Sequence, residues 1–577
     1  MNQQDTGLPP ASPSHAQRYT RLATLLLLVA GPLMYLSFGY TEMAGSDMWW
    51  HVAAGRELVQ TGTPWMVDDW SYTAFGHDWL NHEWLADLLY YGIAAPWGVE
   101  ALVYWKWAVI VATFLLLQLA LARASGSHFA GFLAAVVAAA IAAPFLDVRP
   151  HLYTLLFFSL LLFLLLGRRP RLWLLAPIFV LWVNVHGGFF FGLMALGILV
   201  FPWRELRPDT LRHALLVGGV CALAAVLNPS GVGTFLYPLK YAFDETSPFR
   251  SLAEWLPPDA PGGIRSPLFF VFQWAPLAAL LYLLPPVRKR TGVPWEGLVL
   301  TALTLAMALT SRRFIPIFAM SLAVLLAPLL GLALRALTGR LVAVPVAIVV
   351  LLLAAWRVLP YPLKAAPAFH YLVAEYSYPI DTVDFMRANA LEGKVFAYYN
   401  WGGYLHWRTD GDLKVYIDGR ADTLYDADTY RKYVFVLQSR PGWVEIVEAD
   451  APDFILWPHT RGQGQEKLAA LLETGRWRAV HRDARSWLLA RKDYPLPGPP
   501  HMPPEGPWRD TSRAYQAATE GDVDSVIAYS RFARAQMPWN QLACTMLQRA
   551  LRVREGEAAA QAVFAECWRY FPSRALR

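Results

Sequence analysis

Acidic and histidine side chains gather with tryptophans in one polar stretch, residues 45–91. Carboxylates and imidazoles supply proton transfer or metal ligands, while tryptophans lie at membrane interfaces or stack on sugar rings. The ionisable residues here are Asp47, His51, Asp68, Asp69, His77, Asp78, His82, Glu83 and Asp87, and the tryptophans are Trp49, Trp50, Trp65, Trp70, Trp79 and Trp84. This mixture predicts a reaction or binding site beside a membrane.

A second set of polar residues lies at the ends of apolar segments elsewhere in the chain. It consists of Asp147, Arg149 and His151 in LDVRPH, Asn184 and His186 in VNVHGG, Asn228 in LNPSG, and Arg312 and Arg313 in SRRF. Ionisable groups at membrane depth are costly unless they pair or line a polar cavity. We therefore expect these residues to converge with the tryptophan-rich stretch on one side of the membrane.

The composition indicates an integral membrane protein. The 577 residues are 56% hydrophobic and only 16% charged, and the mean hydropathy is +0.30. The net charge of +6 would suggest nucleic acid in a soluble chain, but the Lys and Arg residues fall in short loops between apolar segments. They are topology signals, and no nucleic-acid partner is expected. Of the three cysteines, Cys544 and Cys567 can form at most one disulfide.

The apolar segments predict about eleven membrane spans within residues 22–365, at roughly 20 residues per span. Residues 1–21 end in basic residues and are expected in the cytoplasm, which makes the first span a retained signal anchor. The positive-inside rule places the basic loops on the same side and the loop 41–100 outside. The predicted spans are 22–38, 101–122, 129–146, 151–166, 171–186, 188–203, 213–228, 267–285, 295–311, 313–333 and 341–359.

From about residue 366 the sequence predicts extracytoplasmic domains. Residues 366–492 alternate strand and helix patterns and predict a small α/β domain. A Pro-rich linker, 493–509, leads to a helical tail, 510–577, that resembles tetratricopeptide helix pairs. The expected strands are VFAYYN, KVYID, DFILWP, WRAVHRD and SWLLAR, and the expected helices are DTVDFMRANA and QEKLAALLETG.

These features resemble the GT-C superfamily of membrane glycosyltransferases, which includes protein O-mannosyltransferases and transferases that use polyprenyl-phosphate sugars. The chain is most similar to a bacterial branch with a DxWWH loop (Asp47 to His51), an HEWL segment (His82 to Leu85) and a WGGYL…IDGRAD stretch (Trp401 to Leu405 and Ile417 to Asp422). The resemblance covers residues 20 to 490 and omits the tail.

The resemblance implies that Asp47 matches the acidic residue of the first external loop. That residue acts as general base on an acceptor or helps to hold a metal. Met48 follows Asp47, so the Asp-Glu pair of the mannosyltransferases is absent. The expected substrate-binding residues are Trp50, His51, Asp78, His82, Glu83, Arg149, His151, His186, Arg312 and Arg313.

Each of these assignments has a structural alternative. Asp47 can cap the helix that follows it. His82 and Glu83 can bind a divalent metal with Asp78 or Asp47, although no cofactor is certain and the spacing matches no known zinc motif. The tryptophans can be interfacial anchors, and Arg149, Arg312 and Arg313 can hold phospholipid headgroups. Asp418, Arg420 and Asp422 fit a salt-bridged turn that docks the α/β domain, or an acceptor site.

Two hypotheses of different classes remain. The first is a multi-pass inner-membrane glycosyltransferase that passes a sugar from a polyprenyl-phosphate carrier to an extracytoplasmic protein, lipid or glycan. The second is a non-enzymatic transporter or assembly scaffold whose outer domain binds partners. A transporter should carry ionisable residues in mid-span and internal repeats, whereas the polar residues of this chain are one-sided.

Overall fold

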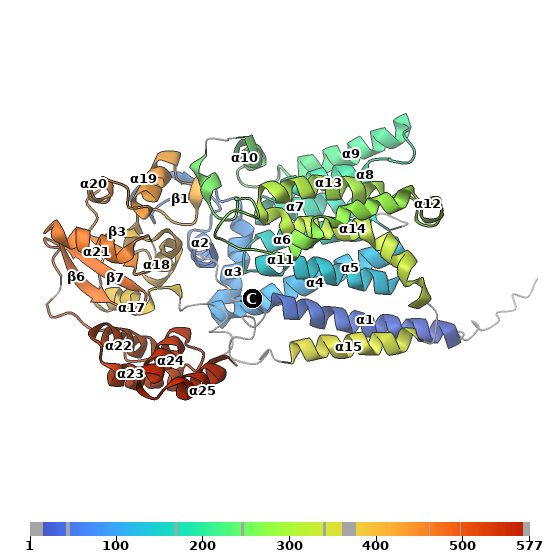
Figure 1. Ribbon diagram of the computed structural model, residues 1–577. Coiled ribbons are helices and arrows are strands. Elements are labelled where there is room, and N and C mark those ends of the chain that lie inside the picture. The colour runs from blue at the N-terminus through green and yellow to red at the C-terminus, as the bar shows by residue number, and fades with distance from the viewer. Residues whose placement is uncertain are drawn as a thin grey trace, which may run out of the picture.

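The computed structural model describes residues 15–41, 47–167, 171–243, 247–337, 342–359, 377–460, 462–496 and 498–568. Within them the chain forms a helical bundle, an α/β domain and a tail of four helices. Helices α2 (Asp47–Thr61) and α3 (Trp84–Trp97) lie between the bundle and the α/β domain (Figure 1). We call this region the junction.

Each predicted span contains helix within the residues that the structure describes. The loop arginines 168, 169 and 340 lie outside the described residues. The bundle helices are α1 (His15–Gly39), α4 (Leu102–Ser125), α5 (His128–Ala142), α6 (His151–Leu165), α7 (Leu175–Val185), α8 (Phe189–Val200), α9 (Pro208–Ala224), α11 (Pro267–Phe272), η5 (Ala275–Leu283), α12 (Pro285–Thr291), α13 (Trp295–Thr310), η6 (Arg312–Phe314), α14 (Ile315–Ala333) and α15 (Ala343–Val358).

Fewer helices than expected are long enough to cross a membrane by themselves. Among the described residues, four helices are long and apolar enough to cross a membrane: Arg18–Gly39, Val99–Ser125, His128–Phe145 and Arg312–Ala333. If the bent pair of Pro267–Leu283 and Pro285–Thr291 counts as one span, there are up to five. A helix such as α6, with 15 residues, extends about 22 Å, less than the hydrocarbon core of about 30 Å. The chain is thus a helical protein with apolar spans, and the count of eleven stays a prediction.

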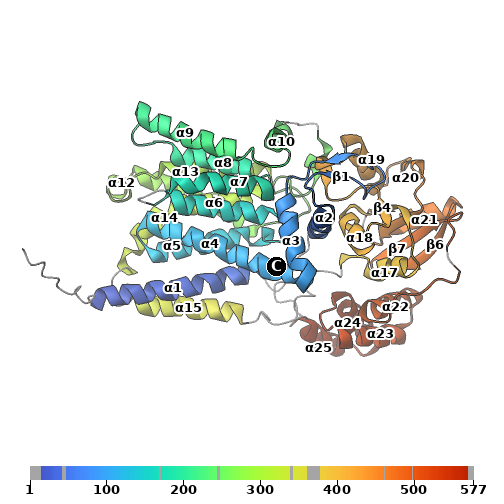
Figure 2. The same ribbon diagram turned by 180° about the vertical axis from the view of Figure 1, so that it is seen from behind.

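Close packing of small residues holds the centre of the bundle together. Helix α5 packs against α4 and α14 through the buried Ala134, Ala135, Ala138 and Ala139. A Cβ on Gly131 of α5 would lie 2.6 Å from the Gln118 carbonyl oxygen of α4. At the edge of the bundle α1 and α15 run side by side (Figures 1 and 2).

The outer surface of the bundle is apolar where a membrane would contact it. On α9, Leu215, Leu216 and Leu223 are 68%, 63% and 73% exposed. On α15, Leu352 and Trp356 are 63% and 71% exposed. Monomeric soluble proteins rarely expose apolar surface on this scale, so lipid is the fitting environment for these faces.

The polar loop of the junction is anchored to the α/β domain. It contains a small antiparallel ribbon, β1 (Met66–Val67) with β2 (Asp78–Trp79). Ser71 then forms a parallel bridge with Val415 at the edge of the domain's sheet, and the Tyr72 N–H donates to the Val415 carbonyl at 3.0 Å. The loop therefore extends the sheet of a domain more than 300 residues away in the chain.

The α/β domain contains all five predicted strands: β3 (Gly393–Ala397), β4 (Leu413–Val415), β5 (Phe454–Pro458), β6 (Trp477–Arg482) and β7 (Ser486–Arg491). Their order is β4-β3-β5-β7-β6, with β3 parallel to β4 and β5 and the other pairs antiparallel. Two helices match the predicted ones, α17 (Ile380–Ala388) and α21 (Gly464–Glu473). Three more were not predicted: α18 (Gly402–Arg408), α19 (Ala427–Leu437) and α20 (Trp443–Ala449).

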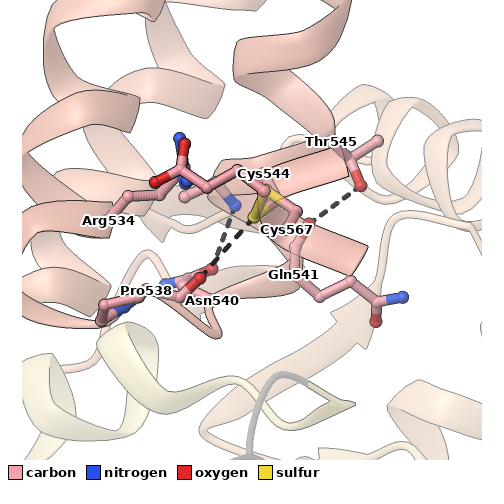
Figure 3. The surroundings of a disulfide bond; sticks show 9 residues. Arg534, Pro538, Asn540, Gln541, Cys544, Thr545 and Cys567 are labelled. Atoms are coloured by element: carbon pink, nitrogen blue, oxygen red, sulfur yellow. Dashed lines mark hydrogen bonds and ion pairs between the residues drawn. A yellow bond between two sulfur atoms is a disulfide. The ribbon is translucent and has the colours of Figure 1, made fainter. Parts of the chain in front are cut away.

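The tail is helical, as the sequence predicts, and nothing in it identifies the tetratricopeptide type. Its helices are α22 (Pro507–Glu520), α23 (Val523–Gln536), α24 (Gln541–Arg554) and α25 (Glu557–Trp568). Consecutive helices pack against each other. Cys544 of α24 and Cys567 of α25 form the one disulfide that the sequence allows (Figure 3), which ties the last helix to the rest of the tail.

Candidate functional site

Glu83 is the residue at which three histidines of the junction meet. Its Oε1 atom lies 3.7 Å from Nε2 of His82 and 3.7 Å from Nε2 of His186. Its Oε2 atom lies 3.8 Å from Nε2 of His51. The Glu83 side chain is only 11% exposed, so a buried carboxyl group faces imidazole nitrogens from three histidines.

The spacing of residues on α2 and α3 accounts for part of this convergence. Residues four apart share a helix face, which places His51 one turn after Asp47 and Asp87 one turn after Glu83. The two helices approach closely at Gly55, where a Cβ would lie 2.1 Å from the Asp87 carbonyl oxygen. Any larger residue at position 55 would separate the two helices and pull the acidic and imidazole groups apart.

His51 is held in place by Asp87. Nδ1 of His51 lies 2.6 Å from Oδ1 of Asp87, and the Asn81 amide donates to Oδ2 of Asp87 at 2.8 Å. Burial lowers the pKa of His51 to about 3, and the nearby Arg149 lowers it further while Asp47 opposes the shift. The imidazole is therefore neutral, and its Nδ1 contact with Asp87 fixes the ring with Nε2 toward Glu83.

His186 has its tautomer fixed by the backbone. The Gly188 N–H donates to Nδ1 of His186 at 2.9 Å, so Nδ1 is an acceptor and the ring proton of the neutral form is on Nε2, facing Glu83. Thr154 of α6 lies 2.7 Å from the same nitrogen. A Cβ on Gly188 would lie 2.0 Å from Oγ1 of Thr154, which explains why the turn after α7 needs a glycine here.

A second feature of the junction is a row of alternating charges. Arg149 pairs with Asp47 through Nη2, and its Nη1 lies 2.6 Å from Oε2 of Glu254. Arg313 continues the row, with Nη1 3.5 Å from Oε1 of Glu254. The guanidinium of Arg313 also lies over the Trp255 ring, 4.0 Å from its centroid.

The row of charges and the Glu83 cluster act on each other electrostatically. Burial raises the pKa of Glu83 well above its usual range, and the carboxylates of Asp87 and Asp47 raise it further, while Arg149 and Arg313 oppose the shift. Burial also lowers the pKa of His82 to about 4. The junction therefore combines two guanidinium groups with a protonatable carboxyl and neutral imidazoles, which suits anion binding next to proton transfer.

Arg312 is separated from Arg313 by its environment, contrary to the expectation that both face a ligand. Its side chain is 1% exposed and donates to backbone carbonyls, including those of Pro257 at 2.8 Å and Ala260 at 2.9 Å. It also contacts the carbonyls of Leu256, Gly262 and Ile264. Arg312 thus fixes the path of the loop before α11.

The remaining predicted residues take different positions. Trp50 packs on His51, with ring centroids 3.6 Å apart. His151 begins α6 and donates from Nε2 to the Phe145 carbonyl at 2.7 Å, while its charge environment includes Arg149 and Arg313. Asp78 is exposed on β2, paired with Val67, and the structure does not bring it into the cluster.

The α/β domain forms one wall of the junction through its two glycine motifs. A Cβ on Gly403 would lie 2.7 Å from Cβ of Trp50, and one on Gly419 would lie 2.9 Å from Nε1 of Trp50 and 3.4 Å from Oδ1 of Asp47. Only glycine permits this approach, so WGGYL and IDGRAD lie directly against the DMWWH segment.

A buried ion-pair network holds that wall in place. Arg420, 2% exposed, pairs with Asp68 of the polar loop at 2.6 Å and with Asp418 at 2.8 Å. Its guanidinium also lies 4.2 Å from the Trp70 ring centroid. Of the two interpretations of this turn, the contacts are those of a salt-bridged turn that docks the domain. Asp422 instead accepts a hydrogen bond from Tyr237 of α10 (Val232–Phe243) at 3.0 Å.

Sequence reasoning missed several residues of the junction. Glu254 lies in a loop that carries no helix or strand pattern, and only the pairing with Arg149 and Arg313 identifies it. Asp87 is counted among the ionisable residues of the polar stretch but not among the site residues, although its position four residues after Glu83 would place the two on one face of a helix. Thr154 lies inside an apolar run, and nothing in its sequence context marks it.

The residues of the junction do not form a recognisable metal site. Within the described parts of the chain, no group of three or more His, Cys, Asp or Glu residues could hold a metal ion.

Comparisons with known proteins do not assign the chain to a family. No model of a known protein family matches it, and a search of curated proteins finds no significant relative.

Proposed function

We propose that the chain is a membrane glycosyltransferase that moves a sugar from a polyprenyl-phosphate carrier to an acceptor outside the cytoplasm. The observation that carries the proposal is that Arg149 and Arg313 lie beside the carboxylates of Asp47 and Glu254, and act electrostatically on the buried carboxyl group of Glu83, at one end of an apolar helical bundle. Phosphate binding and proton transfer are the two tasks of this reaction, and both sets of groups lie in the same place.

These residues have different tasks in the reaction. The acceptor oxygen attacks the anomeric carbon, the bond from that carbon to the phosphate oxygen breaks, and the acceptor proton passes to a base. Asp47, whose side chain is 19% exposed, is the proposed base, in line with the GT-C resemblance. Guanidinium groups stabilise the phosphate as its charge grows, and they therefore favour the transition state over the ground state.

The environment of the site supports a lipid carrier. The bundle presents exposed apolar side chains on α9 and α15, where an isoprenoid chain can approach as readily as other lipids. We propose that the bundle contains about eleven spans and that the junction, the α/β domain and the tail lie outside the cytoplasm. The Cys544–Cys567 disulfide supports this placement because disulfides persist in oxidising compartments.

The test is the Asp47→Asn variant of the purified chain, assayed for transfer from a panel of polyprenyl-phosphate sugars to a periplasmic and envelope acceptor fraction. Loss of the proton acceptor should lower the transfer rate by about 100-fold or more, while the melting temperature stays near that of the unmodified chain. Asp410→Asn is the matched control, because Asp410 pairs with Arg56 of the same helix at 2.5 Å and is 73% exposed.

A normal rate for Asp47→Asn would remove Asp47 from the mechanism. If the unmodified chain transfers no sugar from any carrier of the panel, the proposed function itself is wrong.

A further inference from the structure

Glu254 occupies the position between two guanidinium groups that an anionic ligand would take. Its two carboxylate oxygens divide between two arginines from different segments: Oε2 lies 2.6 Å from Arg149, and Oε1 lies 3.5 Å from Arg313. Two oxygens of a phosphate group can make the same pair of contacts. The side chains of Arg149, Arg313 and Glu254 are 29%, 27% and 28% exposed, so all three can be reached from outside.

The backbone that carries Glu254 is fixed, although its side chain is not enclosed. Ser311 donates from Oγ to the Glu254 carbonyl at 3.1 Å, and the Arg313 N–H donates to the same carbonyl at 3.3 Å. Arg312 holds the following residues by donating to the carbonyls of Pro257 and Ala260. Glu254 can therefore change its rotamer but cannot leave the site with its loop.

Glu254 is a permanent anion at physiological pH. Burial alone would raise its pKa, but the charges of Arg149 and Arg313 prevail and lower it to about 2. Arg149 has a second carboxylate partner in Asp47, so two arginines face two carboxylates and the row is neutral without a ligand. An incoming anion must therefore replace one of these carboxylates at the guanidinium groups.

We infer that Arg149 and Arg313 form the phosphate subsite and that Glu254 is its resident counter-ion, which a phosphate-bearing polyprenyl lipid displaces on binding. This inference rests on the proposed function. The sugar-bearing carrier is a phosphate diester, which has one charge and two free oxygens, as a carboxylate does. The polyprenyl phosphate released from it is a monoester with up to two charges and three acceptor oxygens, so displacement of Glu254 is most favourable for the released phosphate. Glu254 thereby weakens anion binding in general, and its displacement becomes easier as the glycosidic bond breaks and the phosphate gains charge.

The experiment measures binding of undecaprenyl phosphate to the full chain in nanodiscs of neutral lipid, without any sugar transfer. Glu254→Gln keeps the size and an acceptor oxygen but removes the competing charge, so it should tighten binding on the order of tenfold at low ionic strength. Glu254→Asp keeps the charge on a shorter side chain, so its affinity for undecaprenyl phosphate should fall between those of the unmodified chain and Glu254→Gln. Arg313→Ala should weaken binding at least tenfold, in keeping with loss of a charged donor.

Controls separate the source of the effect and the fold of the variants. Glu205→Gln removes a carboxylate paired with Arg207 at 2.7 Å on an exposed part of the bundle and should leave binding unchanged. Phosphatidylglycerol and inorganic phosphate replace the probe in parallel. Binding of inorganic phosphate with the same response to Glu254→Gln would show a phosphate subsite without need of the lipid chain, and equal binding of phosphatidylglycerol would overturn the specificity.

Unchanged or weaker binding of undecaprenyl phosphate by Glu254→Gln would overturn the inference, because Glu254 would then only position the arginines. The binding assay is independent of catalysis. If the chain binds undecaprenyl phosphate as described but transfers no sugar, the proposed function fails while the phosphate subsite stands.

Discussion

Single carboxylates of the junction differ in charge state because their surroundings differ. The pKa of Glu254 falls to about 2 beside two arginines, whereas burial raises the pKa of Glu83 well above its usual range. Glu57 of α2 is a further case. Burial raises its pKa to about 7, and the charge of Asp69 adds to the shift, against the hydrogen bond from Trp70. The junction therefore brings together carboxyl groups with opposite preferences for a proton.

Glu57 gives a prediction on pH and stability. The pKa of an unfolded glutamate is near 4.5, below the value of about 7 in the fold, so the native state binds more protons and stability falls as pH rises through this window. Glu57→Gln is neutral and keeps an acceptor for the Trp70 Nε1–H, which Glu57 accepts at 2.7 Å. The variant should melt about 2 °C higher than the unmodified chain at pH 8 and show little difference at pH 5.

Thermal melting of both proteins at the two pH values checks this expectation. Glu520→Gln, at an exposed position of α22, is the control and should change neither value. A difference that is the same at pH 5 and pH 8 would show that Glu57 does not titrate in this range.

Contacts between elements explain why the glycine motifs WGGYL and IDGRAD of the α/β domain meet the DMWWH segment at the junction. Trp50 of α2 lies against Gly403 of α18 and against Gly419 of the turn after β4. Arg56, also on α2, pairs with Asp410 and lies over the Trp407 ring, 4.7 Å from its centroid. The α/β domain and α2 therefore form a single packed unit at the entrance of the bundle, and the domain covers the charged residues from one side.

The Gly403→Ala substitution tests that packing. The added Cβ would lie 2.7 Å from Cβ and 2.9 Å from the backbone nitrogen of Trp50. Backbone atoms of a helix cannot yield readily, so we expect a destabilisation of about 1–3 kcal/mol. Hydrogen exchange of α2 amides should become faster, because the helix loses its contact with the domain.

Gly498→Ala is the matched control, since nothing lies within 4 Å of a Cβ at that position. If the α2 amides of Gly403→Ala exchange hydrogen no faster than those of the unmodified chain, the packing of the α/β domain on α2 does not depend on this contact.

In the whole molecule, the junction, with its acidic and basic side chains, lies at one end of the bundle, and a basic helix lies at the other. The α/β domain, α2 and α3 lie at one end, and α12, with Arg288, Lys289 and Arg290 in its last turn, lies at the other (Figure 1). This separation is the one that the positive-inside rule requires if the junction faces away from the cytoplasm.

Cysteine labelling tests this orientation. Cys544 and Cys567 form a disulfide and Cys221 is buried, so a Cys221→Ser background suffices. A cysteine at the exposed Asp69 or Thr460 should react with an impermeant maleimide in intact spheroplasts, and one at the exposed Lys289 should stay protected.

Labelling of Lys289→Cys without labelling of Asp69→Cys would invert the orientation. Permeabilised membranes provide the control, since all three positions should react there.

The sequence by itself determined the local elements and the kinds of residue that meet. Short apolar runs located β5 and β7 within a residue of their bounds, because a strand that is buried on both faces leaves a continuous run of apolar residues in the chain. The four-residue spacings of Asp47 with His51 and of Glu83 with Asp87 fix helix faces in the same way. Apolar segments likewise marked the apolar helices of the bundle, but not the basic helix α12, and they do not show which helices cross a membrane.

Only the tertiary structure decided which charged groups become partners. Arg312 and Arg313 are neighbours of the same type, yet one is enclosed by carbonyl oxygens and the other faces Glu254. The pairs Arg149–Glu254 and Arg420–Asp68 join residues more than 100 positions apart. Such contacts depend on how helices and domains pack, and packing leaves no periodic trace in the sequence around either partner.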